Sequence, residues 1–132
     1  MTIIATLERH IVFPGITPIN LYRFSAPSVA AVTTVTDVKF VLHSPAKIEN
    51  IRVSCSSRNY NLSLLLEPGL VPPTIEEVYR AINLNTTEFE DNVEIWWAKP
   101  TGADQHAIFG VVQNNDNIPT GVIHFEFVLV NY

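Results

Sequence analysis

The chain has 132 residues, of which 47% are hydrophobic and only 16% are charged. That length predicts one domain over 1–132, large enough to bury a core without a disulfide or a metal. The net charge of −5 with only eight Lys and Arg residues excludes nucleic acid as a direct partner, because binding a phosphate backbone needs clustered basic residues.

The N-terminus lacks the basic start and apolar core of a signal peptide, and no apolar run is as long as a membrane span. We therefore expect synthesis in the cytoplasm and no membrane contact. Charged residues are also too few to coat the whole surface. Either Ser, Thr and Asn cover the exposed faces, or part of the surface is buried against other chains.

The dominant period along the chain is two residues, which is typical of half-buried β-strands. In the first segment Arg9 alone interrupts a predicted inward face formed by Ile3, Ala5, Leu7, Ile11 and Phe13. A bulge or an edge position would accommodate this arginine. After the PGITP turn, INLYRF predicts a short strand, and the uncharged segment 25–36 predicts an extended loop or arm.

Three more strands are predicted between 37 and 66, where apolar and polar residues alternate and turn clusters separate the runs. The single cysteine, Cys55, alternates with Ile51 and Val53. We expect it to be a small buried thiol, because no histidine lies near it in sequence and burial makes thiols inert.

The segment 74–84 has the signals of a short α-helix. Thr74 and Glu77 fit a capping box, and the apolar positions fall at i, i+3, i+4 and i+7, namely Ile75, Val78, Tyr79 and Ile82. We expect this helix to cover the end or face of a sheet as a lid, with Tyr79 packed into the core.

The acidic stretch from Glu88 to Asn92 offers oxygen ligands for a hard cation, but it lacks the ligand ladder and glycine of an EF-hand-type loop. We expect a solvated loop here, with a weak calcium site as the alternative. In the strand that follows, Trp97 faces the core and Trp96 points outward. Trp96 then needs a cover, which is a sugar ring, a neighbouring subunit or a loop of its own chain.

The stretch QNNDNIPTG, residues 113–121, lies between two predicted strands and is rich in turn-forming residues. We expect a hairpin loop rather than a binding site for a cation or a sugar. In the last strand, Val128 and Val130 make the second face partly apolar. Such a strand is central in its sheet or covered by a partner.

No catalytic motif is recognisable, because the chain has no Gly-x-Ser-x-Gly elbow, no phosphate loop and no zinc-type spacing of Cys and His. We therefore expect no enzymatic activity and no cofactor. His10, His106 and His124 all lie in predicted strands. Their convergence on a metal, as in a cupin-like enzyme, is an alternative that their spacing leaves open.

Together, these patterns predict an all-β fold, a two-sheet antiparallel β-sandwich that is jelly-roll-like, with about eight strands and one short α-helix near 74–84. The order PPTIEEVYRAINLN, VEIWWAKPTG, IFGVVQNNDNIPTGVIHFEFVLV resembles small β-sandwich proteins of tailed-phage virions, of the capsid decoration, tail or neck accessory and fibre types. The resemblance implies a structural protein of the virion that forms symmetric oligomers, often trimers, and binds other virion proteins.

The leading interpretation is a non-enzymatic structural protein that acts through oligomeric protein–protein contacts. Its contact candidates are Trp96, Val128, Val130 and Tyr132, with 25–36 as an arm. The alternative is a carbohydrate-binding, lectin-like module, in which Trp96 stacks on a sugar and loop Asn and Asp side chains bind its hydroxyls.

Overall fold

The computed structural model describes residues 3–42, 46–66, 76–97 and 106–131. Those residues form ten strands and contain no helix, so none of them provides a helix that could span a membrane. The strands are β1 (Ile3–Ile4), β2 (Thr6–Phe13), β3 (Ile19–Ala26), β4 (Thr33–Leu42), β5 (Ala46–Ser54), β6 (Tyr60–Leu66), β7 (Glu76–Leu84), β8 (Glu88–Trp97), β9 (His106–Asn114) and β10 (Ile123–Asn131).

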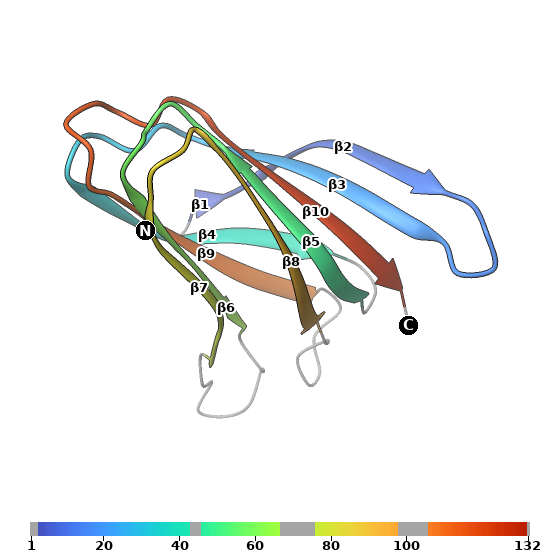
Figure 1. The fold of residues 1–132 in the computed structure, drawn as a ribbon. Helices are drawn as coiled ribbons and strands as arrows, with labels where there is room; N and C mark the ends of the chain where they lie inside the picture. The colour runs from blue at the N-terminus through green and yellow to red at the C-terminus, as the bar shows by residue number, and fades with distance from the viewer. Residues whose placement is uncertain (1–2, 43–45, 67–75, 98–105, 132) are drawn as a thin grey trace.

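The strands form two five-stranded sheets (Figure 1). The β4 sheet has the order β1-β4-β9-β6-β7, and the β10 sheet has the order β2-β3-β10-β5-β8. All pairings are antiparallel except the short parallel contact of β1 with β4. The orders β3-β10-β5-β8 and β4-β9-β6-β7 are those of a jelly roll, to which β1 and β2 are added. The predicted two-sheet sandwich is confirmed, with ten strands instead of about eight.

Aromatic rings from both sheets pack against one another in the core. Phe40 of the β4 sheet packs edge-on against Phe24, Phe125 and Phe127 of the β10 sheet, with centroid separations of 5.2, 4.9 and 5.1 Å. These separations and tilts are the ones that aromatic quadrupoles favour. Cys55 is buried at 9% exposure, as predicted, and burial raises the pKa of its thiol.

The predicted helix near 74–84 is wrong, because Glu76–Leu84 is strand β7; residues 74 and 75 lie outside the described residues. Two bulges in the pairing with β6 explain the misleading spacing. They break the alternation of β7, so that the neighbouring residues Val78 and Tyr79 both pack against the core. Val78 and Tyr79 therefore coincide with adjacent positions of the predicted apolar helix face, whereas Ile82, its last position, is 58% exposed. The core position predicted for Tyr79 is confirmed.

The first segment divides at Ala5, where the chain passes from β1 in the β4 sheet to β2 in the β10 sheet. The bulge predicted at Arg9 is confirmed by a register shift between Leu7 and Arg9, and β2 is an edge strand. The predicted inward face is wrong beyond this bulge, because the register shift places Ile11 and Phe13 on the outer face together with Arg9. Leu7 keeps an inward register opposite Phe24 but is 50% exposed. Near its turn, the β2–β3 hairpin extends beyond the rest of the sandwich (Figure 1), so neither of its faces is fully covered there.

The segment 25–36, predicted as an arm, contains the end of β3, a connection and the start of β4. The connection packs on its own chain, since Val29 is buried and its backbone amide donates to the Thr120 hydroxyl at 2.9 Å. The segment is thus part of the sandwich and not a projecting arm.

Candidate functional site

The outer face of the β10 sheet is divided into a charged half and an apolar half. Cross-strand partners in a sheet point to the same face, so the registers define rows of side chains across the strands. Two rows are mainly polar, Thr6–Ser25–His124–Ser54–Glu88 and Arg9–Arg23–Glu126–Arg52–Glu90. The next two begin with apolar residues, Ile11–Leu21–Val128–Asn50–Asn92 and Phe13–Ile19–Val130–Lys47–Trp96.

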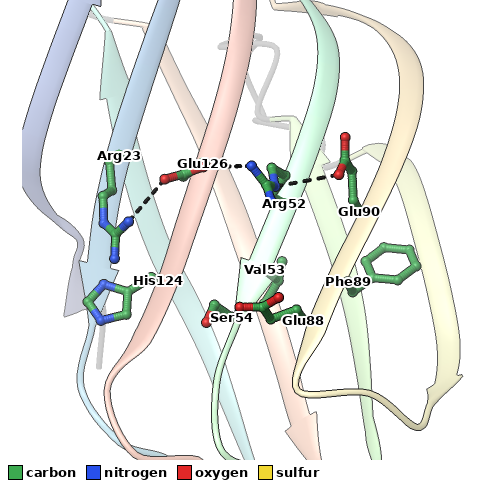
Figure 2. Close-up of a pocket in the computed structure, with 9 residues that line it drawn as sticks. All are labelled: Arg23, Arg52, Val53, Ser54, Glu88, Phe89, Glu90, His124 and Glu126. Atoms are coloured by element: carbon green, nitrogen blue, oxygen red, sulfur yellow. Dashed lines mark hydrogen bonds and ion pairs between the residues drawn. The ribbon is translucent and has the colours of Figure 1, made fainter.

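Four residues of the second row form an ionic ladder of alternating charge, Arg23, Glu126, Arg52 and Glu90, across β3, β10, β5 and β8 (Figure 2). Arg23 Nη1 lies 3.0 Å from Glu126 Oε1, and Arg52 Nη1 lies 3.8 Å from Glu126 Oε2. Arg52 Nε in turn lies 3.6 Å from Glu90 Oε2. Glu126 is the most enclosed member, with a side chain only 17% exposed, so it stabilises the ladder from the central strand.

A hollow of about 420 Å³ lies over the ladder, and His124, Ser54, Glu88 and Phe89 are among its lining residues. His124 Nδ1 lies 2.8 Å from Glu8 Oε1, which links the edge strand β2 to the central strand. The Arg and Glu side chains of the ladder are engaged with one another. The hollow can therefore offer hydrogen bonds to a polar ligand, but it presents no unpaired charge of the ladder to it.

The other half of the face holds an apolar patch formed by Ile11, Phe13, Ile19, Leu21, Val128 and Val130. Phe13 and Ile19 are 52% and 40% exposed, and the other four are half-buried. The patch covers β2, β3 and β10 and ends at the free edge of β2. Val128 and Val130 lie on the middle strand of the sheet, which is the central position that their apolar second face predicted.

Trp96 is 52% exposed, so its predicted outward direction is confirmed. The Lys47 ammonium lies 5.3 Å from its ring centroid, a cation–π contact that partly covers the ring. Trp96 is in the same row as Val130 but on β8, the opposite edge of the sheet from β2. The structure thus brings Val128 and Val130 together and places Trp96 apart from them. Tyr132, the fourth contact candidate, lies outside the described residues, as does the side chain of Trp97.

His10 and His124, two of the three histidines considered for a metal site, point to opposite faces of the β10 sheet. His10 is opposite Tyr22, stacks on its ring at 4.1 Å and lies 2.8 Å from Asn20 Oδ1. His124 belongs to the outer face. These two side chains do not share a site, and no metal-type cluster of His, Cys, Asp or Glu is found among the described residues. The side chain of His106 lies outside them.

The stretch from Glu88 to Asn92 is part of β8, so the predicted solvated loop is wrong. Alternation along the strand separates its carboxylates: Glu88 and Glu90 line the outer hollow, whereas Asp91 accepts a hydrogen bond of 2.8 Å from the Tyr79 hydroxyl. Burial and this bond raise the pKa of Tyr79. Because the carboxylates point in different directions, they do not converge on a cation in the manner that the calcium alternative required.

Residues 113–121 connect strands in different sheets, so the predicted hairpin is wrong, although the stretch is a turn without regular structure after Asn114. Its amide side chains serve the fold. The fully buried Asn114 accepts from Ser57 Oγ at 2.8 Å and donates to the carbonyls of Ile118, Ala30 and Val29 at 2.8, 3.2 and 3.3 Å.

Asp116 likewise binds backbone amides of its own chain, and the one from Arg58 is the main reason why its pKa is lowered. Gly121 takes a positive φ of 67° where the chain turns into β10, a conformation that glycine adopts without strain. The polar side chains of this loop therefore hold neighbouring connections of the chain together.

No protein family and no curated protein matches the sequence. Among solved structures, the chain is similar to one in "Structure of infectious bursal disease virus Gx strain", with 13% identity and a TM-score of 0.42 over 95% of this chain and 33% of that chain. It is also similar to "Family 16 Carbohydrate Binding Module-2", with 8% identity and a TM-score of 0.40 over 96% of each chain. A third similarity is to "CBM4 structure and function", with 12% identity and a TM-score of 0.31 over 97% of this chain and 78% of that chain.

This chain spans about one third of the length of the viral chain. Similarities this weak do not indicate what this chain binds or assembles with.

Proposed function

We propose that the protein is a non-enzymatic assembly subunit that buries the apolar patch of the β10 sheet against another protein subunit. The observation that carries this proposal is the patch itself, six apolar side chains on three adjacent strands. Monomeric proteins expose single apolar residues routinely, but a contiguous apolar area rimmed by polar residues is typical of an interaction surface.

The distribution of all exposed large hydrophobic residues also favours an interface at the end of the sandwich that holds the β2–β3 turn. Of the eleven large hydrophobic residues that are exposed among the described residues, five lie in the β2–β3 hairpin: Leu7, Val12, Phe13, Ile16 and Ile19. Phe13 and Ile19 belong to the outer face and Ile16 to the turn beside them, so a subunit that covers the outer face near this turn would bury all three. The ionic ladder beside the patch then forms the polar rim that specific interfaces have.

We further propose that the assembly is a virion, in line with the resemblance to small virion β-sandwiches. The resemblance to tailed-phage proteins is a pattern of strands and turns and assigns no residue roles. The contact residues are therefore taken from the patch, which includes the predicted candidates Val128 and Val130.

The proposal is tested by sedimentation velocity on the protein from low to high micromolar concentration. The double variant Phe13→Ser/Ile19→Ser removes the two most exposed side chains of the patch, and we expect it to weaken self-association at least tenfold. The matched control is Ile118→Ser/Val122→Ser, whose residues are 46% and 55% exposed at the opposite end of β10. Equal weakening by both double variants, or a wild-type protein that stays monomeric and binds no co-purified virion protein, would refute the proposal.

A second candidate function is favoured by the hollow over the ionic ladder. Its size and its mixture of guanidinium, carboxylate, imidazole and hydroxyl groups suit the hydroxyls of a saccharide. Trp96 is six residues from Glu90 along β8, about 20 Å at the usual rise of a strand, so it does not line this hollow. Calorimetric titration with neutral oligosaccharides would support this candidate if binding were abolished by Ser54→Trp, which fills the hollow, and retained in Trp96→Ala.

A further inference from the structure

The four sheet edges of this sandwich differ in how well they are protected against pairing with another strand. An uncovered edge offers a row of free backbone donors and acceptors, and proteins protect such edges with charges, bulges or covering segments. The edge at β8 carries four carboxylates, Glu88, Glu90, Asp91 and Glu94. Two copies paired through β8 would bring eight negative charges together.

The edges of the β4 sheet are also protected. β7 is distorted by two bulges and carries Glu77 and Arg80 on its exposed side. At the other edge, the two-residue β1 pairs with β4 at Val38 and Lys39, and the Ala5 amide donates to the Lys39 carbonyl at 2.9 Å. β1 thus interrupts the edge of β4 and leaves only a bulged run before Val38 and a short run after Lys39 uncovered. Self-pairing is therefore hindered at three of the four edges.

The edge at β2 has the weakest protection. Its bulge is confined to the start of the strand, and the run from His10 to Phe13 contains no Asp, Glu, Lys or Arg. This run continues regularly until Pro14, and all its side chains except the half-buried Ile11 are exposed. From this difference between the edges we infer that two copies of the chain pair antiparallel through β2, which joins their β10 sheets into one ten-stranded sheet.

The side chains of β2 select the register of this pairing. Opposed residues in an antiparallel pair share a face, so a two-fold axis must pass beside one residue and its copy. Centring on Arg9 would set two guanidinium groups opposite each other, and centring on His10 would set two imidazoles opposite each other. Centring on Val12 or Phe13 would set Pro14, which has no backbone N–H, opposite His10 or Val12. Centring on Ile11 avoids these arrangements, because it sets Ile11 against Ile11 and Arg9 against Phe13 of the other copy. That second pair is a favourable cation–π combination.

The charge distribution favours a second copy as the occupant of this edge, even though each chain carries a net charge of −5. The acidic β8 is four strands away from β2 in each sheet. In the joined sheet the two β8 strands would lie at opposite ends, about 43 Å apart at the usual strand spacing. That separation is well beyond the Debye length of about 8 Å at physiological salt, so their mutual repulsion is screened.

The pairing also extends the surface that the proposed function uses, and in this respect the inference rests on that proposal. The apolar patch ends at β2, and a two-fold axis perpendicular to the sheet leaves the outer face of each copy on the same side. Two patches would therefore become one continuous apolar surface across the dimer axis. A surface of that size is a suitable contact for the further subunits of an assembly.

The pairing is tested by placing charged side chains at position 11, beside the proposed dimer axis. Ile11→Lys and Ile11→Glu each place like charges opposite each other, and we expect each variant alone to weaken dimerisation at least tenfold in sedimentation velocity. An equimolar mixture of the two places Lys opposite Glu, and we expect it to restore the dimer. Mixing cannot restore a variant that has merely misfolded. The control pair Ile82→Lys and Ile82→Glu changes a residue of 58% exposure on β7 and should leave dimerisation unchanged.

A cysteine scan checks the register independently. Under mild oxidation, Ile11→Cys should give a disulfide-linked dimer, whereas Arg9→Cys should form one only when mixed with Phe13→Cys. The native Cys55 is buried and does not compete. If Ile11 variants dimerise as wild type does, or if the mixture fails to restore the dimer, the pairing through β2 is wrong. A wild-type protein that does not self-associate refutes the pairing, and the proposed function then fails only if the protein also binds no co-purified virion protein. The proposed function survives without the pairing if association is lost in Phe13→Ser/Ile19→Ser but kept in the Ile11 variants.

Discussion

Replacing Asn114 with Ala tests whether the polar stretch 113–121 is a structural clamp. In the folded protein this side chain is fully buried and makes hydrogen bonds of 2.8 Å with both Ser57 Oγ and the Ile118 carbonyl. Truncation removes both of these bonds, although Ser57 retains a bond of 3.2 Å to the Asn59 carbonyl. A buried polar group that loses its partner costs about 1–3 kcal/mol, so the two groups together predict a loss of about 2–6 kcal/mol in the free energy of unfolding.

The assay is urea unfolding followed by tryptophan fluorescence. For a protein of this size, with an m-value of about 2 kcal/mol/M, the midpoint should fall by about 1–3 M. The matched control is Asn61→Ala, which removes bonds of 2.9 Å to the Asn83 amide and 3.4 Å to Gln113 Oε1 at a solvent-exposed place. We expect that control to lose less than about 1 kcal/mol. If Asn114→Ala lost no more than Asn61→Ala, the clamp interpretation would be refuted.

Three further predictions concern buried hydroxyls, backbone strain and the ionic ladder. Tyr79→Phe should lose about 1 kcal/mol, whereas Tyr60→Phe should be neutral or stabilising, because the buried Tyr60 hydroxyl has no hydrogen-bond partner among the described residues; urea unfolding of both variants measures this. The pKa of both tyrosines is raised above the ordinary 10.0. Their contribution to the free energy of unfolding is therefore fully present below pH 10 and is lost as the pH rises further. A free energy of unfolding that stays constant between pH 10 and 12 would contradict this, and Tyr79→Phe should make its decrease with pH less steep. Val32→Asn should raise the free energy of unfolding by about 1 kcal/mol, because Val32 has a φ of 52° that a β-branched residue tolerates poorly; a lower melting temperature in calorimetry would count against it. Glu126→Gln should lower the free energy of unfolding by about 1–2 kcal/mol and Glu90→Gln by under about 1 kcal/mol, because their side chains are 17% and 57% exposed. In urea unfolding, a midpoint for Glu90→Gln at or below that for Glu126→Gln would contradict this.

Alternation of period two was a good guide to which residues form strands, and it correctly placed Trp96 outward, Cys55 inward and a bulge at Arg9. It failed where a second physical effect acts on the same residues. In β7, bulges set two neighbouring side chains against the core and imitated a helix. In β2, the bulge between Leu7 and Arg9 moves Ile11 and Phe13 to the outer face, and simple alternation does not predict that exchange of faces.

The outer face of the β10 sheet could not be predicted, because it depends on strand order. Arg23, Arg52, Glu90 and Glu126 are spread over about a hundred residues of sequence and become neighbours only through the pairings of β3, β10, β5 and β8. Each shows only as a charged residue between inward-facing ones. The same holds for the apolar patch, for which Val128 and Val130 were the signal in the sequence. Their partners Leu21 and Ile19 had no distinguishing pattern.

The most direct test of the account is hydrogen–deuterium exchange of the backbone amides at low and high protein concentration. If the outer face of the β10 sheet is the assembly surface, raising the concentration should slow exchange in β2, β3 and the second half of β10. Exchange in β7 and in the first half of β8 should not change. Slower exchange at high concentration confined to β7 or β8, with none in β2, would contradict the account.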